Sequence, residues 1–153
     1  MLVNVVYAIC RGSKISTTEM MATRAIKFDG KHWHYLFCLH NGRNLSPIQL
    51  SGQRILKIVE SSKTHNFIKS IDILFCDEIG QVSAEFLFSI DIVLRRVSNN
   101  NIFFGGSLTI GTIDHTQIQL SEGRPFLTSS HMIPCFRMVE SKQSARANSD
   151  PSW

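Results

Sequence analysis

The spacing of apolar residues changes along the chain from a continuous run to a helical period. Residues 71–76 form a nearly unbroken apolar run, which is typical of a strand buried on both faces in a parallel sheet. In residues 84–97 the apolar positions recur at intervals of three and four, which predicts an amphipathic helix. Residues 50–61 predict a second helix, and residues 3–9 and 107–111 predict shorter strands.

The remaining segments have a less regular pattern. Residues 13–18 are polar and predict a turn, and the hydroxyl residues there could cap a helix over residues 19–27. Further along, residues 126–133 predict a short helix, residues 135–139 predict a last strand, and the polar tail 141–153 is expected to fray. Because strands alternate with helices, the predicted fold class is α/β with a mainly parallel sheet.

Composition excludes several classes of protein. With 153 residues, 43% hydrophobic and 18% charged, the chain is long enough for one domain with a real core and is not a disordered protein. No apolar stretch approaches the roughly 18 residues of a membrane span, so no membrane partner is expected. The four cysteines form no C-x-x-C pair, which favours buried reduced thiols over disulfides or a zinc site. The net charge of +4 permits a nucleic-acid partner without requiring one.

Two carboxylates, Asp77 and Glu78, follow the apolar run directly. Functional groups of parallel sheets gather at the carboxyl ends of strands, and burying a carboxylate is costly unless it is paired or holds a metal. In nucleotide-hydrolysing enzymes this arrangement is a Walker B motif, in which the Asp holds Mg²⁺ and the neighbouring acid activates water. The alternative is a strand that ends in a solvated Asp-Glu turn.

Four places in the chain together resemble a known family. They are residues 25–37, the block Asp77-Glu78-Ile79-Gly80, residues 104–117 and residues 144–146. In this order they resemble a superfamily 1 DNA helicase of the petite-integration-frequency (PIF) and RecD-like group, in the first motor domain downstream of its phosphate-binding loop. The resemblance implies a RecA-like fold of the P-loop NTPase type, incomplete over residues 1–153, with helices on both faces of the sheet.

The resemblance also implies roles for particular residues. Asp77 would hold Mg²⁺ and Glu78 would activate the attacking water. Gln117 would sense the γ-phosphate of ATP, and Arg146 would neutralise the charge of the transition state. For Arg146 the alternative is a solvated residue of the tail.

The loop before Gln117 departs from the family pattern. Thr112 and Ile113 separate Gly111 from Asp114, although the spacing of three between Asp114 and Gln117 is kept. In addition, Ile-Gln stands at 118–119 where the family has Leu-Pro. Either this branch has a modified loop or its phosphate sensor is impaired.

By the same resemblance, Gly30, His32, His34 and Phe37 would contact single-stranded DNA. Cations and aromatic rings at the end of a strand suit phosphate contact and base stacking. His32 stands where the family usually has Thr. The alternative is that Trp33 and Phe37 belong to the hydrophobic core and that the histidines are polar residues of the surface. A metal site from His32 and His34 is disfavoured.

No G-x-x-x-x-G-K-[ST] loop appears in the chain. The resemblance places that loop before Met1 and a second motor domain after Trp153, so the isolated chain is expected to bind ATP poorly and not to hydrolyse it. The predicted whole is an ATP-dependent helicase that acts on single-stranded or forked DNA in DNA maintenance, recombination and repair, in the nucleus or mitochondrion. The alternatives are an inactive remnant that binds nucleic acid or protein weakly, and an unrelated P-loop ATPase.

Overall fold

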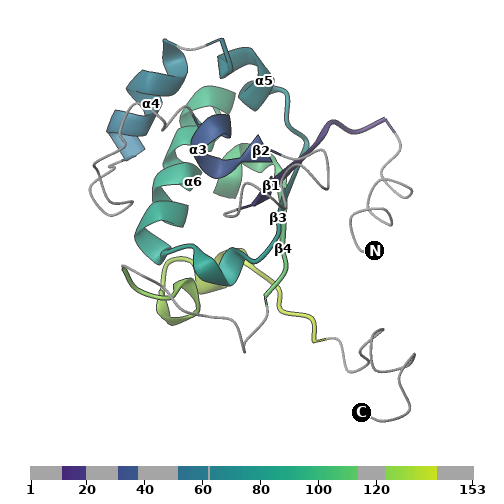
Figure 1. Cartoon of the computed structure of the whole chain (residues 1–153), viewed down its shortest axis with the longest axis vertical. Coiled ribbons are helices and arrows are strands. Elements are labelled where there is room, and N and C mark those ends of the chain that lie inside the picture. The colour runs from purple at the N-terminus through teal and green to yellow at the C-terminus, as the bar shows by residue number, and fades with distance from the viewer. Residues whose placement is uncertain (1–11, 20–30, 38–51, 62, 114–122, 141–153) are drawn as a thin grey trace.

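A parallel sheet of four strands organises the part of the chain that the structure describes, and the strand order is β2-β1-β3-β4 (Figure 1). The computed structural model describes residues 12–19, 31–37, 52–61, 63–113 and 123–140. The strands are β1 (Ile15–Glu19), β2 (Lys31–His32), β3 (Ile73–Cys76) and β4 (Leu108–Gly111), and each pair of neighbours is parallel. The α/β class and the parallel sheet predicted from the sequence are confirmed.

The helices of the described residues gather on one side of this sheet, so helices on both of its faces, which the resemblance implies, are not seen within the described residues (Figure 1). They are α3 (Trp33–Leu36), α4 (Gly52–Glu60), α5 (His65–Lys69) and α6 (Ala84–Ser98). The predicted helices at 50–61 and 84–97 are therefore confirmed to within two residues at their ends. In the part of the chain that the structure describes, no helix is long and apolar enough to cross a membrane.

Helix α6 has clear signals at both of its ends. The hydroxyl of Ser83 accepts a hydrogen bond from the backbone N–H of Phe86 at 3.2 Å, so it caps the first turn. Asn99 ends the helix in the left-handed conformation, with φ 50°, which Asn tolerates better than most residues. Between these caps the apolar face of α6 is buried, as its period of three and four predicted.

The prediction of a turn at 13–18 is wrong, because β1 occupies most of this segment. The side chains of Ser16, Thr17 and Thr18 are buried, and the Thr18 hydroxyl donates to the backbone oxygen of Phe75 at 3.2 Å. A β-branched hydroxyl residue can therefore form a buried strand when its hydroxyl finds a backbone acceptor. The helix predicted to begin at residue 19 is also wrong at its start, since that residue ends β1. Its residues 20–27 and the strand predicted at 3–9 lie outside the described residues.

Two further predictions fail near residue 130. In place of one helix at 126–133 there are two short 3₁₀ turns, η5 (Phe126–Thr128) and η6 (Ile133–Cys135). Residues 136–139 form no strand, and the ring of Phe136 lies 5.6 Å from the ring of Phe104. Pro134 lies inside η6, where it cannot donate a backbone hydrogen bond, so it limits regular structure on both sides.

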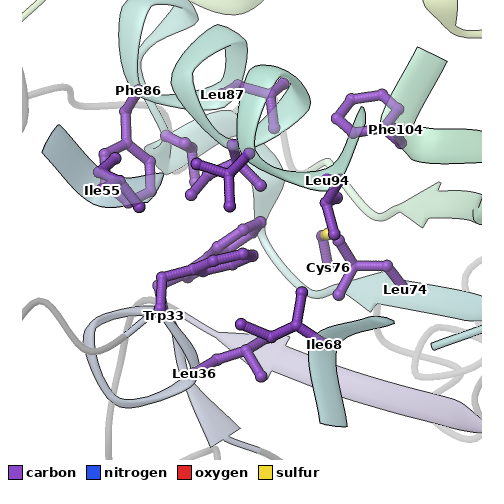
Figure 2. Packing of buried hydrophobic residues seen from close by; sticks show 14 of the residues in the cluster. Trp33, Leu36, Ile55, Ile68, Leu74, Cys76, Phe86, Leu87, Leu94 and Phe104 are labelled. Carbon is purple, nitrogen blue, oxygen red and sulfur yellow. The ribbon is translucent and has the colours of Figure 1, made fainter. Parts of the chain in front are cut away.

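The core lies between the sheet and α6, with Trp33 near its centre (Figure 2). The Trp33 ring stacks on Phe37 at a centroid distance of 5.8 Å and meets Phe86 of α6 edge-on at 5.9 Å. Leu74 and Cys76 of β3 join the same cluster. All four residues of β3 are buried, which confirms the strand buried on both faces that the apolar run predicted.

The strand order creates one particular position in the sheet. From β1 the chain adds β2 on one side, and it then adds β3 and β4 on the other. The direction of winding therefore reverses between β1 and β3. In open parallel sheets ligands bind outside the carboxyl ends of the strands at such a reversal.

Candidate functional site

Asp77 and Glu78 lie at the carboxyl end of β3, beside this reversal. The backbone N–H of Asp77 donates to the backbone oxygen of Thr18 in β1 at 3.0 Å, so the ladder between the two strands extends to the first acid. Glu78 has a left-handed backbone, with φ 52° and ψ 43°, which turns the chain sharply away from the sheet. A non-glycine residue held in this conformation is uncommon and often marks a functional site. Both acidic side chains are half-buried.

The hydroxyl of Thr112 joins the two acids. It donates to the carboxylate of Asp77 in a short hydrogen bond, and it accepts the backbone N–H of Glu78 at 3.0 Å. Thr112 directly follows β4, so it reaches the acids from the neighbouring strand. A hydroxyl residue next to the end of a strand is the only sequence signal of this contact.

A side-chain amide holds the second acid. The Nε2 of Gln81 donates to Oε2 of Glu78 at 2.6 Å. The 3₁₀ turn η3 (Ile79–Gln81) brings Gln81 back toward Glu78, three residues earlier in the chain. Each acid of the pair therefore has its own hydrogen-bond donor, a hydroxyl for Asp77 and an amide for Glu78.

Gly111 allows the turn after β3 to pack on β4. A Cβ at this position would lie 2.7 Å from Cγ2 of Ile79, closer than real Cβ contacts come. Ile79 is 1% exposed, so it cannot move outward without leaving the core. The absence of a side chain at Gly111 therefore fixes how closely the Asp-Glu turn lies against the end of β4.

The residues at this edge fit Mg²⁺ bound together with a phosphate. Mg²⁺ prefers oxygen ligands and is usually held by one or two carboxylates plus the phosphates of a substrate. Asp77 supplies such a carboxylate at the edge of the sheet. Within the described ranges no group of three or more His, Cys, Asp or Glu side chains could hold a metal without a ligand's help. A metal site built on His32 therefore gains no support from these residues.

The thiol of Cys76, directly before the two acids, is expected to be unreactive. Cys76 is buried, and burial raises the pKa of its thiol to about 12, although a hydrogen bond with Thr18 acts in the opposite direction. Cys135 is a second free cysteine, and its pKa is also raised, mainly by burial. The predicted buried, reduced thiol is confirmed for Cys76, whereas Cys135 is half-buried. Cys10 and Cys38 lie outside the described residues.

The predicted DNA contacts have different environments. His32 ends β2 and is half-buried, and it pairs in register with the last residue of β1, so it lies at the same edge of the sheet as Asp77. Phe37 is 0% exposed and is stacked on Trp33, so it has no free face for a base, which favours the core alternative for both aromatic residues. His34 lies in α3, and Gly30 lies outside the described residues.

Two residues predicted to act on the γ-phosphate cannot be placed. Gln117 and Arg146 both lie outside the described residues, as does Asp114. The described chain stops at Ile113 on this side, one residue beyond Thr112. The roles of Gln117 and Arg146 remain predictions.

Comparison with known proteins gives matches among solved structures. No protein-family model and no curated protein matches the chain. It superposes on the crystal structure of Pif1 helicase from Candida albicans with a TM-score of 0.74 over 86% of its length, at 18% identity. The chain folds like part of a Pif1 helicase. It also matches Bacteroides Pif1 bound to ssDNA, with a TM-score of 0.59, 21% identity and 79% of the chain covered.

A third match extends the comparison to a nucleotide complex. Bacteroides Pif1 in complex with ADP-AlF4 superposes with a TM-score of 0.57 at 22% identity over 87% of the chain. The chain spans 30% of the Candida albicans Pif1 chain and 28% of this one. The resemblance to PIF-group helicases and the RecA-like fold are therefore confirmed at the level of the fold.

Proposed function

We propose that this chain is part of an ATP-dependent DNA helicase and carries the acids that hold magnesium and activate water for ATP hydrolysis. The observation that carries the proposal is the Asp77-Glu78 turn at the winding reversal of a Pif1-like sheet, with each acid held by a separate donor. Support also comes from the Pif1 relatives by fold, one of which is bound to ssDNA and another to ADP-AlF4.

The two acids divide the chemistry. Mg²⁺ bound with ATP would neutralise negative charge on the phosphates, and Asp77 is the residue that would hold it. Glu78 would accept a proton from the attacking water. The hydrogen bond that the side-chain amide of Gln81 donates keeps the Glu78 side chain in one orientation.

Two further residues complete the proposed reaction by resemblance to the family. Gln117 would respond to the γ-phosphate, and Arg146 would stabilise the charge that develops during phosphoryl transfer. Removing the side chain of Arg146 is expected to slow hydrolysis more than it weakens ATP binding, because it acts on charge in the transition state.

We propose single-stranded or forked DNA as the macromolecular partner. Among the Pif1 structures that share this fold, one is of Bacteroides Pif1 bound to ssDNA and another concerns DNA unwinding at forked dsDNA by two coordinating Pif1 helicases. His32 lies at the same edge of the sheet as the acids, so a strand of DNA there would be close to the nucleotide. Unwinding of this kind would serve DNA maintenance, recombination and repair, in the nucleus or mitochondrion.

The test is DNA-stimulated ATP hydrolysis by the full-length protein. We expect Glu78→Gln to reduce turnover by at least about 100-fold, because general base catalysis contributes roughly that much or more. Binding of a fluorescent ATP analogue should persist in the variant. Glu85→Gln is the matched control, because it removes the same charge from the start of α6, outside the acid pair. Unchanged turnover in Glu78→Gln would rule out Glu78 as the base.

A further inference from the structure

Thr112 lies next to both acids and is hydrogen-bonded to each of them. Its hydroxyl makes two hydrogen bonds to consecutive residues, one to the carboxylate of Asp77 and one from the backbone N–H of Glu78. Its own backbone N–H donates to Cys76 at 3.0 Å, and its backbone oxygen accepts from Ile79 at 2.9 Å. The residue is thus bonded to all four positions of the turn, 76–79.

The hydroxyl of Thr112 is an acceptor in one of these bonds and a donor in the other. A Thr hydroxyl has one proton to donate, and it accepts through its oxygen lone pairs. Because the oxygen receives the N–H of Glu78, its single proton is free to point at Oδ1 of Asp77. The bond engages Oδ1 and restricts rotation of the carboxylate, so Oδ2 is the oxygen that we expect to bind a metal.

We infer that Thr112 is a positioning residue that orients Asp77 toward magnesium and fixes the turn at Glu78. This inference rests on the proposed function. It also gives a reason for the departure at 112–113, where two residues separate Gly111 from Asp114. Thr112 is one of these two residues. The same departure that suggested an impaired phosphate sensor therefore supplies the hydroxyl that holds Asp77. Residues that orient metal ligands typically change metal affinity or activity by about 10–100-fold when they are replaced.

A purely structural role for Thr112 makes a different prediction. Its two backbone bonds would hold the end of β4 against the turn even without a hydroxyl. In that case Thr112→Val would change the stability of the protein at most, and metal binding would not change. Thr109 offers a matched comparison on β4, because its hydroxyl is buried and makes no hydrogen bond within the described residues.

The experiment measures binding of Mn²⁺, as a spectroscopic substitute for Mg²⁺, to the full-length protein in complex with a non-hydrolysable ATP analogue. Electron paramagnetic resonance reports free Mn²⁺ directly, so no turnover is needed. We expect Thr112→Val to weaken Mn²⁺ binding by about 10-fold or more. Thr112→Ser, which keeps the hydroxyl, should remain within about threefold of the wild type, and Thr109→Val should match the wild type. Thr112→Ala serves as a second variant without a hydroxyl if Thr112→Val does not fold.

The outcomes separate this inference from the proposed function. If the wild type binds Mn²⁺ with the nucleotide and Thr112→Val binds it equally well, the inference is overturned and the proposed function stands. The inference is also overturned if Thr112→Ser binds as weakly as Thr112→Val, because the hydroxyl would then not be the group that matters. If the wild type binds no Mn²⁺ with the nucleotide, the proposed function fails and the inference fails with it.

Discussion

At the scale of single residues, the two acids are held by different chemical groups. The hydroxyl of Thr112 engages Asp77, and the amide of Gln81 engages Glu78 at 2.6 Å. A metal ligand and a general base both benefit from a side chain that is held in one orientation. The arrangement therefore suits an Asp that binds and a Glu that accepts a proton. Neither donor could be assigned from the sequence alone.

Cys76 gives a prediction at the same scale. Because burial raises the pKa of its thiol to about 12, the thiol stays protonated and unreactive in the native protein at neutral or mildly alkaline pH. We expect iodoacetamide at pH 8 to leave Cys76 unmodified while it labels Cys135 slowly, and both should react after unfolding. Mass mapping of the labelled peptides reads this out. Native labelling of Cys76 as fast as that of Cys135 would contradict the buried position of β3.

At the scale of elements, α6 holds the turn that leads into β4. Asp91 of α6 is 1% exposed, and its carboxylate accepts the backbone N–H of Phe104 at 2.6 Å and pairs with Arg95 at 2.8 Å. Phe104 belongs to the 3₁₀ turn η4 (Phe103–Gly106). A buried carboxylate with both kinds of partner is satisfied, so it fixes η4 on the helix. Because β4 starts two residues later, this contact sets where Thr112 arrives.

Gly105 in η4 provides a test of this packing. It has φ +65°, and a Cβ there would lie 2.4 Å from the backbone oxygen of Leu94 in α6. We expect Gly105→Ala to lower the free energy of unfolding by about 2–4 kcal/mol, from overpacking and backbone strain combined. Gly12→Ala is the control, because Gly12 also has a positive φ, +92°, but its Cβ would meet nothing within 4 Å. Denaturant unfolding of both variants reads out the difference, and equal losses would contradict close packing of η4 on α6.

The start of α6 carries an ion pair that should respond to pH. Arg124 donates to Glu85 at 2.7 Å, and this side-chain bond lowers the pKa of Glu85 below its usual value. A lowered folded pKa means that the pair stabilises the fold above the unfolded pKa of about 4.3, and that this contribution is lost as pH falls through the folded pKa. Arg124 is exposed and Glu85 is partly exposed, so solvent screens the pair and its contribution is about 0.2–1 kcal/mol.

We therefore expect Glu85→Gln to reduce stability slightly at pH 7 and to have little effect well below pH 4, as measured by urea unfolding across pH. Arg124→Gln should give a similar loss at pH 7, and the double variant should lose little more than either single variant. A loss by Glu85→Gln that is the same at low and neutral pH would show that the ion pair is not its cause.

At the scale of the whole molecule, the parts that the sequence could predict are those with a strong period. The apolar run of β3 and the three-and-four spacing of α6 predicted both elements correctly, because each buries a face that its pattern reveals. Strand β1 was missed because its buried residues are Ser and Thr, which leave no apolar pattern, and because the acceptor for the Thr18 hydroxyl lies in another strand. The bond from Thr112 to Asp77 was missed for a related reason, since it depends on β4 lying in register beside β3.

The order of the strands in the sheet explains the position of Asp77 and Glu78. The order β2-β1-β3-β4 brings the ends of β1, β3 and β4 together at one edge, around the winding reversal. Residues that are far apart in sequence, Thr18, Asp77 and Thr112, become neighbours there through backbone and hydroxyl bonds. The Pif1-like fold thus brings the described residues of the candidate site together at the ends of strands.

The measurement that tests this account most directly is ATP-driven unwinding of forked DNA by the full-length protein with Asp77→Asn. The account predicts that the wild type separates the fork in the presence of Mg²⁺ and that Asp77→Asn loses this activity while remaining folded. Asp72→Asn is the control, because Asp72 precedes the same strand at its amino end, where it accepts the backbone N–H of Lys14. Unwinding by Asp77→Asn at the wild-type rate would contradict the assignment of the carboxyl edge of the sheet as the magnesium and nucleotide site.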